Sequence, residues 1–420
     1  MTLDARSVLR RFLLLRGLRW FPTGLLIPVL VLLLLERGLT LGQIGLVFAA
    51  QGFMVLVLEL PTGGLADAIG RRPVLLVATI FETAAIALLI VADSLPMLAV
   101  VAGLQGIYRA LESGPLDAWY VDTVQALDPD ADIERGLSGG GVVIGVAIGA
   151  GSLVSSLLVA VHPIPGVDPL VTPLVAVLAL RALEFGAIAG LLTEHRAGIR
   201  SPGWRGAVSG VPVIVGAAIA AVRGSRVLLS LVLVDFLWGF GLTAFELFTP
   251  AKLGTVVDGA DRAAALLGPT SSGAWLGAAG GAALIPVLSR RWGPGWTGAV
   301  LRVAQGLTVL GIAFAAGPVG VIIAYVFTMG VNGAANPVHE GMLHRAVVDP
   351  GMRTTVVSAN SLTAQTGGML GGIALGTLAD VASLTTGIVV GAIILAAPAP
   401  LYLLAGRGAG SEETEAPTPD

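Results

Sequence analysis

Twelve apolar stretches, each long enough to cross a lipid bilayer, follow one another along this chain of 420 residues. A transmembrane helix needs about 20 mostly apolar residues to cross about 30 Å of hydrocarbon. Only 12% of the residues are charged, against about 25% in soluble domains, which excludes an ordinary soluble fold. Because backbone in lipid must satisfy its own hydrogen bonds, we expect an all-α membrane protein with twelve transmembrane helices. The expected spans are 12–35, 41–62, 74–93, 95–121, 137–161, 169–192, 227–249, 264–288, 296–316, 318–343, 355–379 and 384–405.

The distribution of basic residues predicts the orientation of these spans, since arginine and lysine are retained in cytoplasmic loops. With a cytoplasmic amino terminus, the cytoplasmic loops and tails hold sixteen arginines, and the opposite loops hold only Arg37, Lys252 and Arg262. We therefore expect a multi-pass protein of the cell membrane with both termini in the cytoplasm. The apolar run from Ala207 to Val222 has arginines on both sides, which favours a helix lying in the membrane interface over another crossing.

The spans divide the chain into two halves of six helices each. We expect an N-terminal half over 1–192, a cytoplasmic central loop with the interfacial helix over 193–225, and a C-terminal half over 226–405. Residues 406–420 are expected to form a disordered acidic tail, because so short a polar segment cannot bury a core.

A weak internal repeat relates the two halves, as in many transporter folds. Three landmarks recur at offsets of 223, 222 and 218 residues in equivalent loops and helices. Similar hydropathy in any two halves would also produce such matches, so both interpretations stand. The matched pairs are Gly70 with Gly293, Pro115 with Pro337, and Arg135 with Arg353.

The segment GGLADAIGRRPVL, from Gly63 to Leu75, falls between the second and third expected spans. It resembles the signature GxLaDrxGrkxxl of the major facilitator superfamily and departs from it at Ala68, where a basic residue is common. Residues 59–62 (ELPT) and 113–122 (SGPLDAWYVD) also resemble a pattern found among bacterial exporters of that superfamily. The strong positions that match are Gly63, Leu65, Asp67, Gly70, Arg71, Arg72 and Leu75.

The resemblance implies the twelve-helix fold of the superfamily, with two six-helix pseudo-repeat halves, and secondary transport by alternating access. It implies that Asp67 lies against the start of the eleventh helix, where exposed amides favour a carboxylate. It also implies that Arg71 reaches an acid at the end of the fourth helix, which here is Asp122. Such contacts belong to a closed cytoplasmic gate. Charges that serve only as topology signals are the alternative. The expected gate residues are Gly63, Asp67, Gly70, Arg71, Arg72 and Asp122.

Helices 1, 4, 7 and 10 line the central cavity in the superfamily, and all four carry polar residues here. A charge at the bilayer centre costs at least about 2.5–3.5 kcal/mol, so polar groups in spans are candidates for function. On these helices the residues expected to form a substrate or proton pathway are Arg109, Glu112, Asp117, Asp235, Trp238, Asn332, Asn336 and His339.

Some of these residues have simpler interpretations. Arg109 and Glu112 are three residues apart and could neutralise each other within one helix. Asp235 has no acid or base near it in the sequence, which favours a proton-binding or counter-ion role, and Trp238 could serve packing alone. Two basic residues of the first span, Arg16 and Arg19, could extend to the membrane interface. Three charges on helices that are peripheral in the superfamily rank lower: Glu82, Arg181 and Glu184.

Enzymatic chemistry has no support in the sequence. The string HEGMLH places its histidines five residues apart, not the four of the zinc-protease signature, and the single lysine, Lys252, excludes a phosphate-binding GxxxxGK loop. We expect no enzyme activity, no cofactor, no metal and no nucleic-acid partner.

The sequence favours ion-coupled efflux of a small organic compound by an antiporter, with protons as the candidate coupling ion, the lipid bilayer as the other partner and a monomeric state. Uptake of a metabolite by a symporter is the first alternative. A polytopic membrane protein that is not a transporter is the second. Ala102 stands where proton-driven members often carry an arginine ahead of Gln105.

Overall fold

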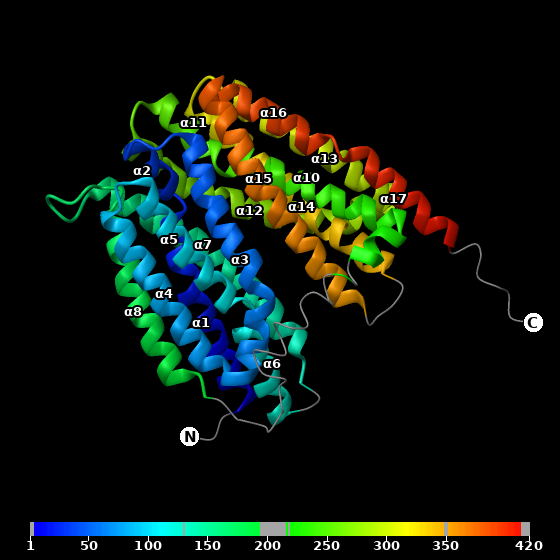
Figure 1. Cartoon of the computed structure of the whole chain (residues 1–420), viewed down its shortest axis with the longest axis horizontal. Helices are drawn as coiled ribbons and strands as arrows, with labels where there is room; N and C mark the ends of the chain where they lie inside the picture. The colour runs from blue at the N-terminus through cyan, green and yellow to red at the C-terminus, as the bar shows by residue number, and fades with distance from the viewer. Residues whose placement is uncertain (1–3, 129–130, 194–215, 217–218, 348–351, 413–420) are drawn as a thin grey trace, which may run out of the picture. The chain divides into compact units, whose positions relative to one another are not determined.

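A computed structural model describes residues 4–128, 131–193, 216, 219–347 and 352–412, and these residues form helices and connecting loops with no strand among them (Figure 1). The interfacial helix expected over 207–222 falls mostly outside the described residues, as do the last eight residues of the expected tail, 413–420. The final helix runs to Glu412 and so extends past residue 406, where we expected the tail to begin.

Each expected span corresponds to a helical segment, and four segments are divided by a short break into two helices. In ten of the spans the helix is long and apolar enough to cross a membrane. The other two spans are less apolar. One is divided into α5 and α6 and contains Arg109 and Glu112, and the other is α15, which begins with a polar run. The helices are α1 (Ala5–Leu26) and α2 (Leu30–Glu36), α3 (Leu41–Ile69), α4 (Arg71–Val91), α5 (Leu95–Glu112) and α6 (Pro115–Leu127), α7 (Ile133–Val161), α8 (Thr172–Leu191), α10 (Arg226–Glu246) and α11 (Phe248–Val257), α12 (Ala260–Trp292), α13 (Pro294–Phe314), α14 (Pro318–Ala346), α15 (Arg353–Val381), and α16 (Leu384–Ala396) and α17 (Ala399–Glu412).

The break between α5 and α6 changes which side chains share a face. Gly114 adopts φ +93°, a left-handed conformation that suits glycine, and Pro115 begins the next helix without a backbone N–H to donate. Side chains before and after Gly114 therefore do not share one continuous helical face. Tyr120, beyond the break, is buried and stacks on Phe12 with ring centroids 4.4 Å apart.

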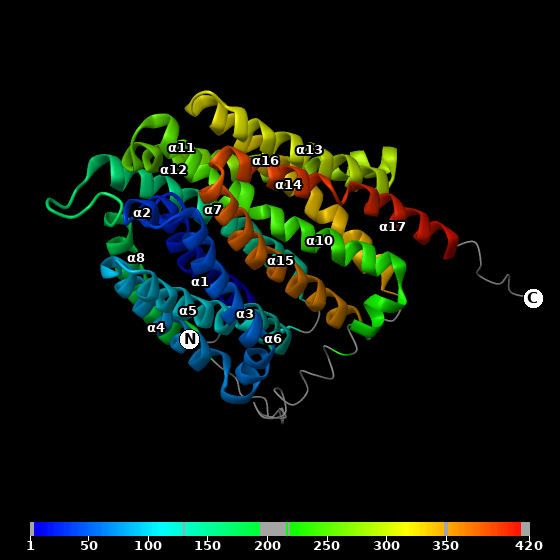
Figure 2. The same cartoon turned by 45° about the horizontal axis from the view of Figure 1, so that its top comes forward.

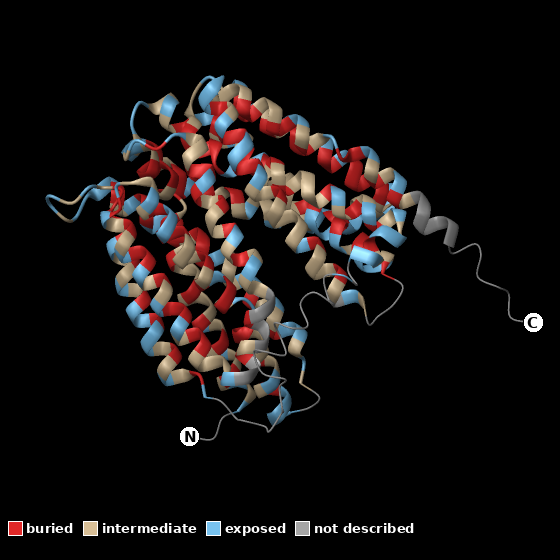
Figure 3. Ribbon diagram, in the orientation of Figure 1, coloured by how far each residue is buried: buried red, intermediate tan, exposed pale blue. Residues whose placement is uncertain are grey.

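The chain forms two compact units, each with its own core. The first comprises residues 1–38, 50–211 and 259–272, and the second comprises residues 39–49, 212–258 and 273–420. In the first unit, α1 packs on α7 and α8, while α4 packs on α5 and α8. Buried residues recur along α8 with helical spacing, so one face of this helix contacts its neighbours (Figure 3). They include Val177, Arg181, Glu184 and Ile188.

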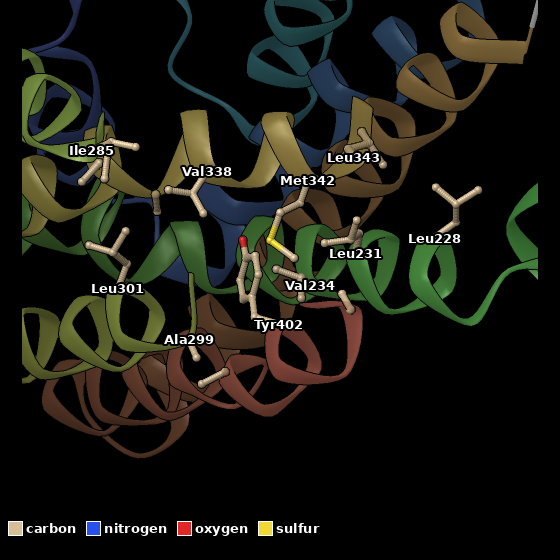
Figure 4. Packing of buried hydrophobic residues seen from close by; sticks show 14 of the residues in the cluster. Leu228, Leu231, Val234, Ile285, Ala299, Leu301, Val338, Met342, Leu343 and Tyr402 are labelled. Carbon is tan, nitrogen blue, oxygen red and sulfur yellow. The ribbon is translucent and has the colours of Figure 1, made fainter. Parts of the chain in front are cut away.

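In the second unit, α10 packs along α15 and against α16 and α17, and α13 packs against α14, α16 and α17 (Figures 1 and 2). Its core surrounds Tyr402, whose ring lies among side chains such as Val234 and Met342 (Figure 4). Residues 39–49 belong to this unit because the start of α3 contacts α15: the Asp380 carboxylate accepts hydrogen bonds from the backbone N–H groups of Leu41 (2.9 Å) and Gly42 (2.8 Å).

Local structure repeats between the two units. Gly70 and Gly293 both adopt positive φ (101° and 76°) directly before helices of 21 residues, α4 and α13. The matched prolines differ, because Pro115 begins α6 whereas Pro337 lies inside the unbroken α14. The structural match therefore holds for the loops before α4 and α13 and does not hold for the fourth and tenth spans.

Candidate functional site

A chain of polar side chains crosses the second unit, and each comes from a different helix. His339 of α14 places Nε2 3.3 Å from Oδ1 of Asp235 on α10. Asn360 of α15 donates a hydrogen bond from Nδ2 to the other carboxylate oxygen at 2.5 Å. On its far side, His339 Nδ1 shares a hydrogen bond of 2.9 Å with the hydroxyl of Tyr402 on α17. His339 is buried, so this acid and base meet largely out of water.

Arg302 of α13 extends this chain. Its Nη2 donates to the Tyr402 hydroxyl at 3.5 Å, and its Nη1 donates to Gln305 Oε1 at 2.8 Å. The guanidinium also lies 5.9 Å from the ring centroid of Trp238. These contacts are neutral, although the side chain is buried. Burying a cation among neutral groups is costly, because no opposite charge in contact compensates it. The positive charge of Arg302 therefore acts strongly on the other groups of this network.

Trp238 and Asn332 join the same network. Trp238 Nε1 donates to Asn332 Oδ1 at 2.9 Å, and Gln305 Nε2 donates to the same oxygen at 3.1 Å. The structure thus brings Asp235, Trp238, Asn332 and His339 into one connected region, with a polar role for Trp238 beyond packing. Asn336, on the same helix, is exposed.

The first unit contains a second polar region, built on α1. Arg19 Nη2 lies 3.1 Å from Glu112 Oε2, and Arg16 Nη1 donates to Asp117 Oδ1 at 2.6 Å. The Arg19 guanidinium also lies 4.5 Å from the ring centroid of Tyr108. Arg19 is buried, so it does not extend to the membrane interface. Glu112 therefore has a charged partner on another helix, besides the proximity to Arg109 that the sequence suggested.

Further into this unit, Arg181 of α8 contacts the side chains of Glu184, Tyr108 and Glu82, and the backbone carbonyl of Arg19. It pairs with Glu184 on its own helix, donates from Nη1 to the Tyr108 hydroxyl at 3.0 Å, and lies 3.8 Å from Glu82 Oε1 on α4. All four side chains are buried. Arg109, by contrast, is exposed on α5.

The expected gate motif lies at the junction of α3 and α4. Arg71 Nη2 lies 2.7 Å from Asp122 Oδ2 on α6, and Arg72 donates to the backbone carbonyl of Ala189 on α8. Gly70 provides the positive φ that separates the two helices. Both contacts stay within the first unit. The side chains of Gly63 and Asp67 lie outside the described residues, although their backbone continues α3.

Sequence reasoning missed or ranked low several members of these networks. Their shared signal is a polar or charged residue inside an apolar span, which is expensive unless it is partnered. Applied evenly to every helix, without weighting toward helices 1, 4, 7 and 10, that signal would have found most of them. They are Arg19, Glu82, Arg181, Glu184, Arg302, Asn360 and Tyr402.

The family model described as Major Facilitator Superfamily matches residues 12–372. The chain belongs to the major facilitator superfamily. No curated protein matches the sequence. Among solved structures, a bacterial homolog of the human lysosomal transporter Spinster, in an inward-facing and occupied conformation, has a TM-score of 0.77 at 16% identity, covering 97% of this chain and 98% of that one.

Two further solved structures share the fold. The nucleoside transporter NupG has a TM-score of 0.74 at 15% identity, covering 97% of this chain and all of that one. A structure from a study of proton-dependent oligopeptide transporters has a TM-score of 0.65 at 14% identity, covering 97% and 98% of the two chains. At these identities the likeness shows the fold alone, which is the twelve-helix superfamily architecture. The family match makes the chain a multi-pass membrane protein of a transporter family.

Proposed function

We propose that the chain is a proton-coupled exporter of a small organic compound that works by alternating access. The observation that carries this proposal is the contact between Asp235 and His339, two groups able to bind protons, 3.3 Å apart in the interior of the second unit. Asn360 and Tyr402 hold the pair from either side.

A proton arriving at this pair changes a buried charge. With Asp235 ionised and His339 neutral, the carboxylate offsets the buried guanidinium of Arg302, and one added proton leaves a net positive charge. Because charge in a low-dielectric interior is costly, the two protonation states favour different surroundings. The equilibrium between two conformations that differ in the access of water to this pair then depends on its protonation, which is the requirement for coupling.

The direction and the setting of transport rest on the sequence. Residues 59–62 and 113–122 resemble exporters of the superfamily, which supports efflux by antiport. The arginine asymmetry supports a cell-membrane protein with both termini in the cytoplasm. The chain supplies the acids and bases of the pathway from one polypeptide, which supports a monomer as the working unit.

The compound is sought first by thermal stabilisation of the purified protein with a panel of nucleosides, dipeptides, organic anions and lipophilic cations. Proteoliposomes that enclose a pH-sensitive dye then report whether a stabilising compound moves protons across the membrane. The proposal expects proton movement that saturates with the compound and does not occur without it. Protons and the compound should cross the membrane in opposite directions. Compound exchange that is saturable but leaves the enclosed pH unchanged would refute proton coupling. Co-directional movement would refute export.

A further inference from the structure

The first unit holds a buried charge cluster that the proposed function does not use. It lies where α1, α4, α5 and α8 meet, and the ring of Tyr108 contacts both of its arginines. The charged members are Arg19, Glu82, Glu112, Arg181 and Glu184. Four of the five charged side chains expose less than a tenth of their surface, and Glu112 exposes 15% of its side chain.

The cluster contains three carboxyl groups and two guanidinium groups. Arg19 is matched with Glu112 at 3.1 Å, so Arg181 is left to serve both Glu82 and Glu184. Arg109, which is exposed on α5, adds a more distant positive charge to the field at Glu82. A buried carboxylate without a close partner is expensive, and the usual resolution is that one carboxyl of such a group takes up a proton.

Glu82 is the member with the weakest contacts. Its Oε1 lies 3.8 Å from Arg181 Nη2, a distance too long for a hydrogen bond, and its Oε2 is buried without a hydrogen-bond partner among the described residues. Arg181 Nη2 likewise makes no hydrogen bond in the described part of the chain. Glu184, by contrast, is in direct contact with Arg181 on the same helix.

The other unit shows that the fold does not require an acid at this place. Arg302 and Tyr402 follow Glu82 and Arg181 at offsets of 220 and 221 residues, close to the offsets that relate the two halves. They also contact each other between the equivalent helices α13 and α17. In the second unit, a neutral and a cationic side chain therefore fill the equivalent positions. Packing alone does not require the carboxyl group of Glu82.

We propose that Glu82 is a proton-binding site and that its proton decides how Arg181 is shared. With the proton bound, Arg181 pairs with Glu184, as in the structure. When the proton leaves to water, the Glu82 carboxylate attracts Nη2 of Arg181 more strongly and shortens their 3.8 Å separation, which draws α4 and α8 together at this level. The site lies in the opposite unit from Asp235 and does not depend on the identity of the transported compound.

Infrared titration of the purified protein tests this proposal without any substrate. The carbonyl stretch of a protonated carboxylic acid in apolar surroundings should be present at neutral pH and be lost at alkaline pH. Glu82→Asp should displace the frequency of this band, and Glu82→Gln should abolish it. Glu134→Asp, which makes the same change at an exposed position on α7, is the matched control and should leave the frequency unchanged.

Absence of the band in the unmodified protein at neutral pH would overturn the proposal. So would a band that is displaced by Glu184→Asp and not by Glu82→Asp. Thermal unfolding of each variant shows whether it is folded, and the conservative Glu82→Asp change keeps the test decisive if Glu82→Gln does not fold. Either overturning result would leave the proposal for Asp235 untouched, because that rests on transport-linked proton movement.

Discussion

The crossing of α1 and α7 offers a quantitative test of the packing in the first unit. A methyl group added at Gly151 of α7 would lie 2.3 Å from the backbone carbonyl oxygen of Phe21 and 3.0 Å from the Cα of Gly24, both on α1. A methyl group added at Gly145, on the same helix, would meet no described atom within 4 Å. The variants Gly151→Ala and Gly145→Ala therefore make the same chemical change in two environments.

The expected difference follows from two terms. Alanine favours a helix over glycine by about 0.8–1.0 kcal/mol, and this gain applies to both variants. Overpacking typically costs about 1–3 kcal/mol and applies only at Gly151, where rigid backbone cannot turn aside as a side chain could. We expect Gly145→Ala to raise the free energy of unfolding by up to about 1 kcal/mol. Gly151→Ala should fall below it by about 1–3 kcal/mol.

Unfolding titrations of the purified variants in mixed detergent micelles measure this difference, with tryptophan fluorescence as the readout. If Gly151→Ala raises the free energy of unfolding as much as Gly145→Ala does, the close approach of α1 and α7 on which the first unit is built is refuted.

Three further outcomes follow from described contacts. Exchanging the charges of Arg71 and Asp122 together should restore transport that either single reversal impairs, and no recovery in the double variant would argue against pairing. Each single reversal should change the free energy of unfolding by only about 0.2–1 kcal/mol, because the pair is partly exposed. Asp380→Ala should lower the free energy of unfolding by about 0.5–2 kcal/mol through the loss of a helix cap on α3, measured by the same titration, while Asp380→Asn should retain much of it. Tyr402→Phe should cost about 1–3 kcal/mol because it leaves Nδ1 of buried His339 without its partner, and an unchanged stability would show that this hydrogen bond is not formed.

The number of spans and the family could be read from the sequence, because length and hydropathy determine which segments cross a bilayer and the Gly63–Leu75 segment carries a specific pattern. The connection of α3 to α4 was also foreseeable, since Gly70 marks a position that needs positive φ. The break at Gly114 was not, because a Gly-Pro pair is tolerated inside many membrane helices.

The partners of the buried charges could not be derived in the same way. Asp235 and His339 were both candidates, but their contact joins helices 104 residues apart in the sequence, and only the packing of α10 on α14 brings them together. For Arg19 the sequence suggested a position that the structure does not show. Its place near the end of an expected span allowed an interfacial position, whereas Glu112 and Tyr108 hold it inside the first unit.

Proton movement by the Asp235→Asn variant tests the central claim most directly. Asparagine keeps the size of the side chain and can still contact Asn360 and His339, but it cannot bind the coupling proton. In proteoliposomes with an enclosed pH indicator, the unmodified protein and the control Asp261→Asn, at an exposed position in the first turn of α12, should both move protons when the stabilising compound is added. The Asp235→Asn variant should bind the compound and move no protons. Proton movement that is unchanged in Asp235→Asn would contradict the account.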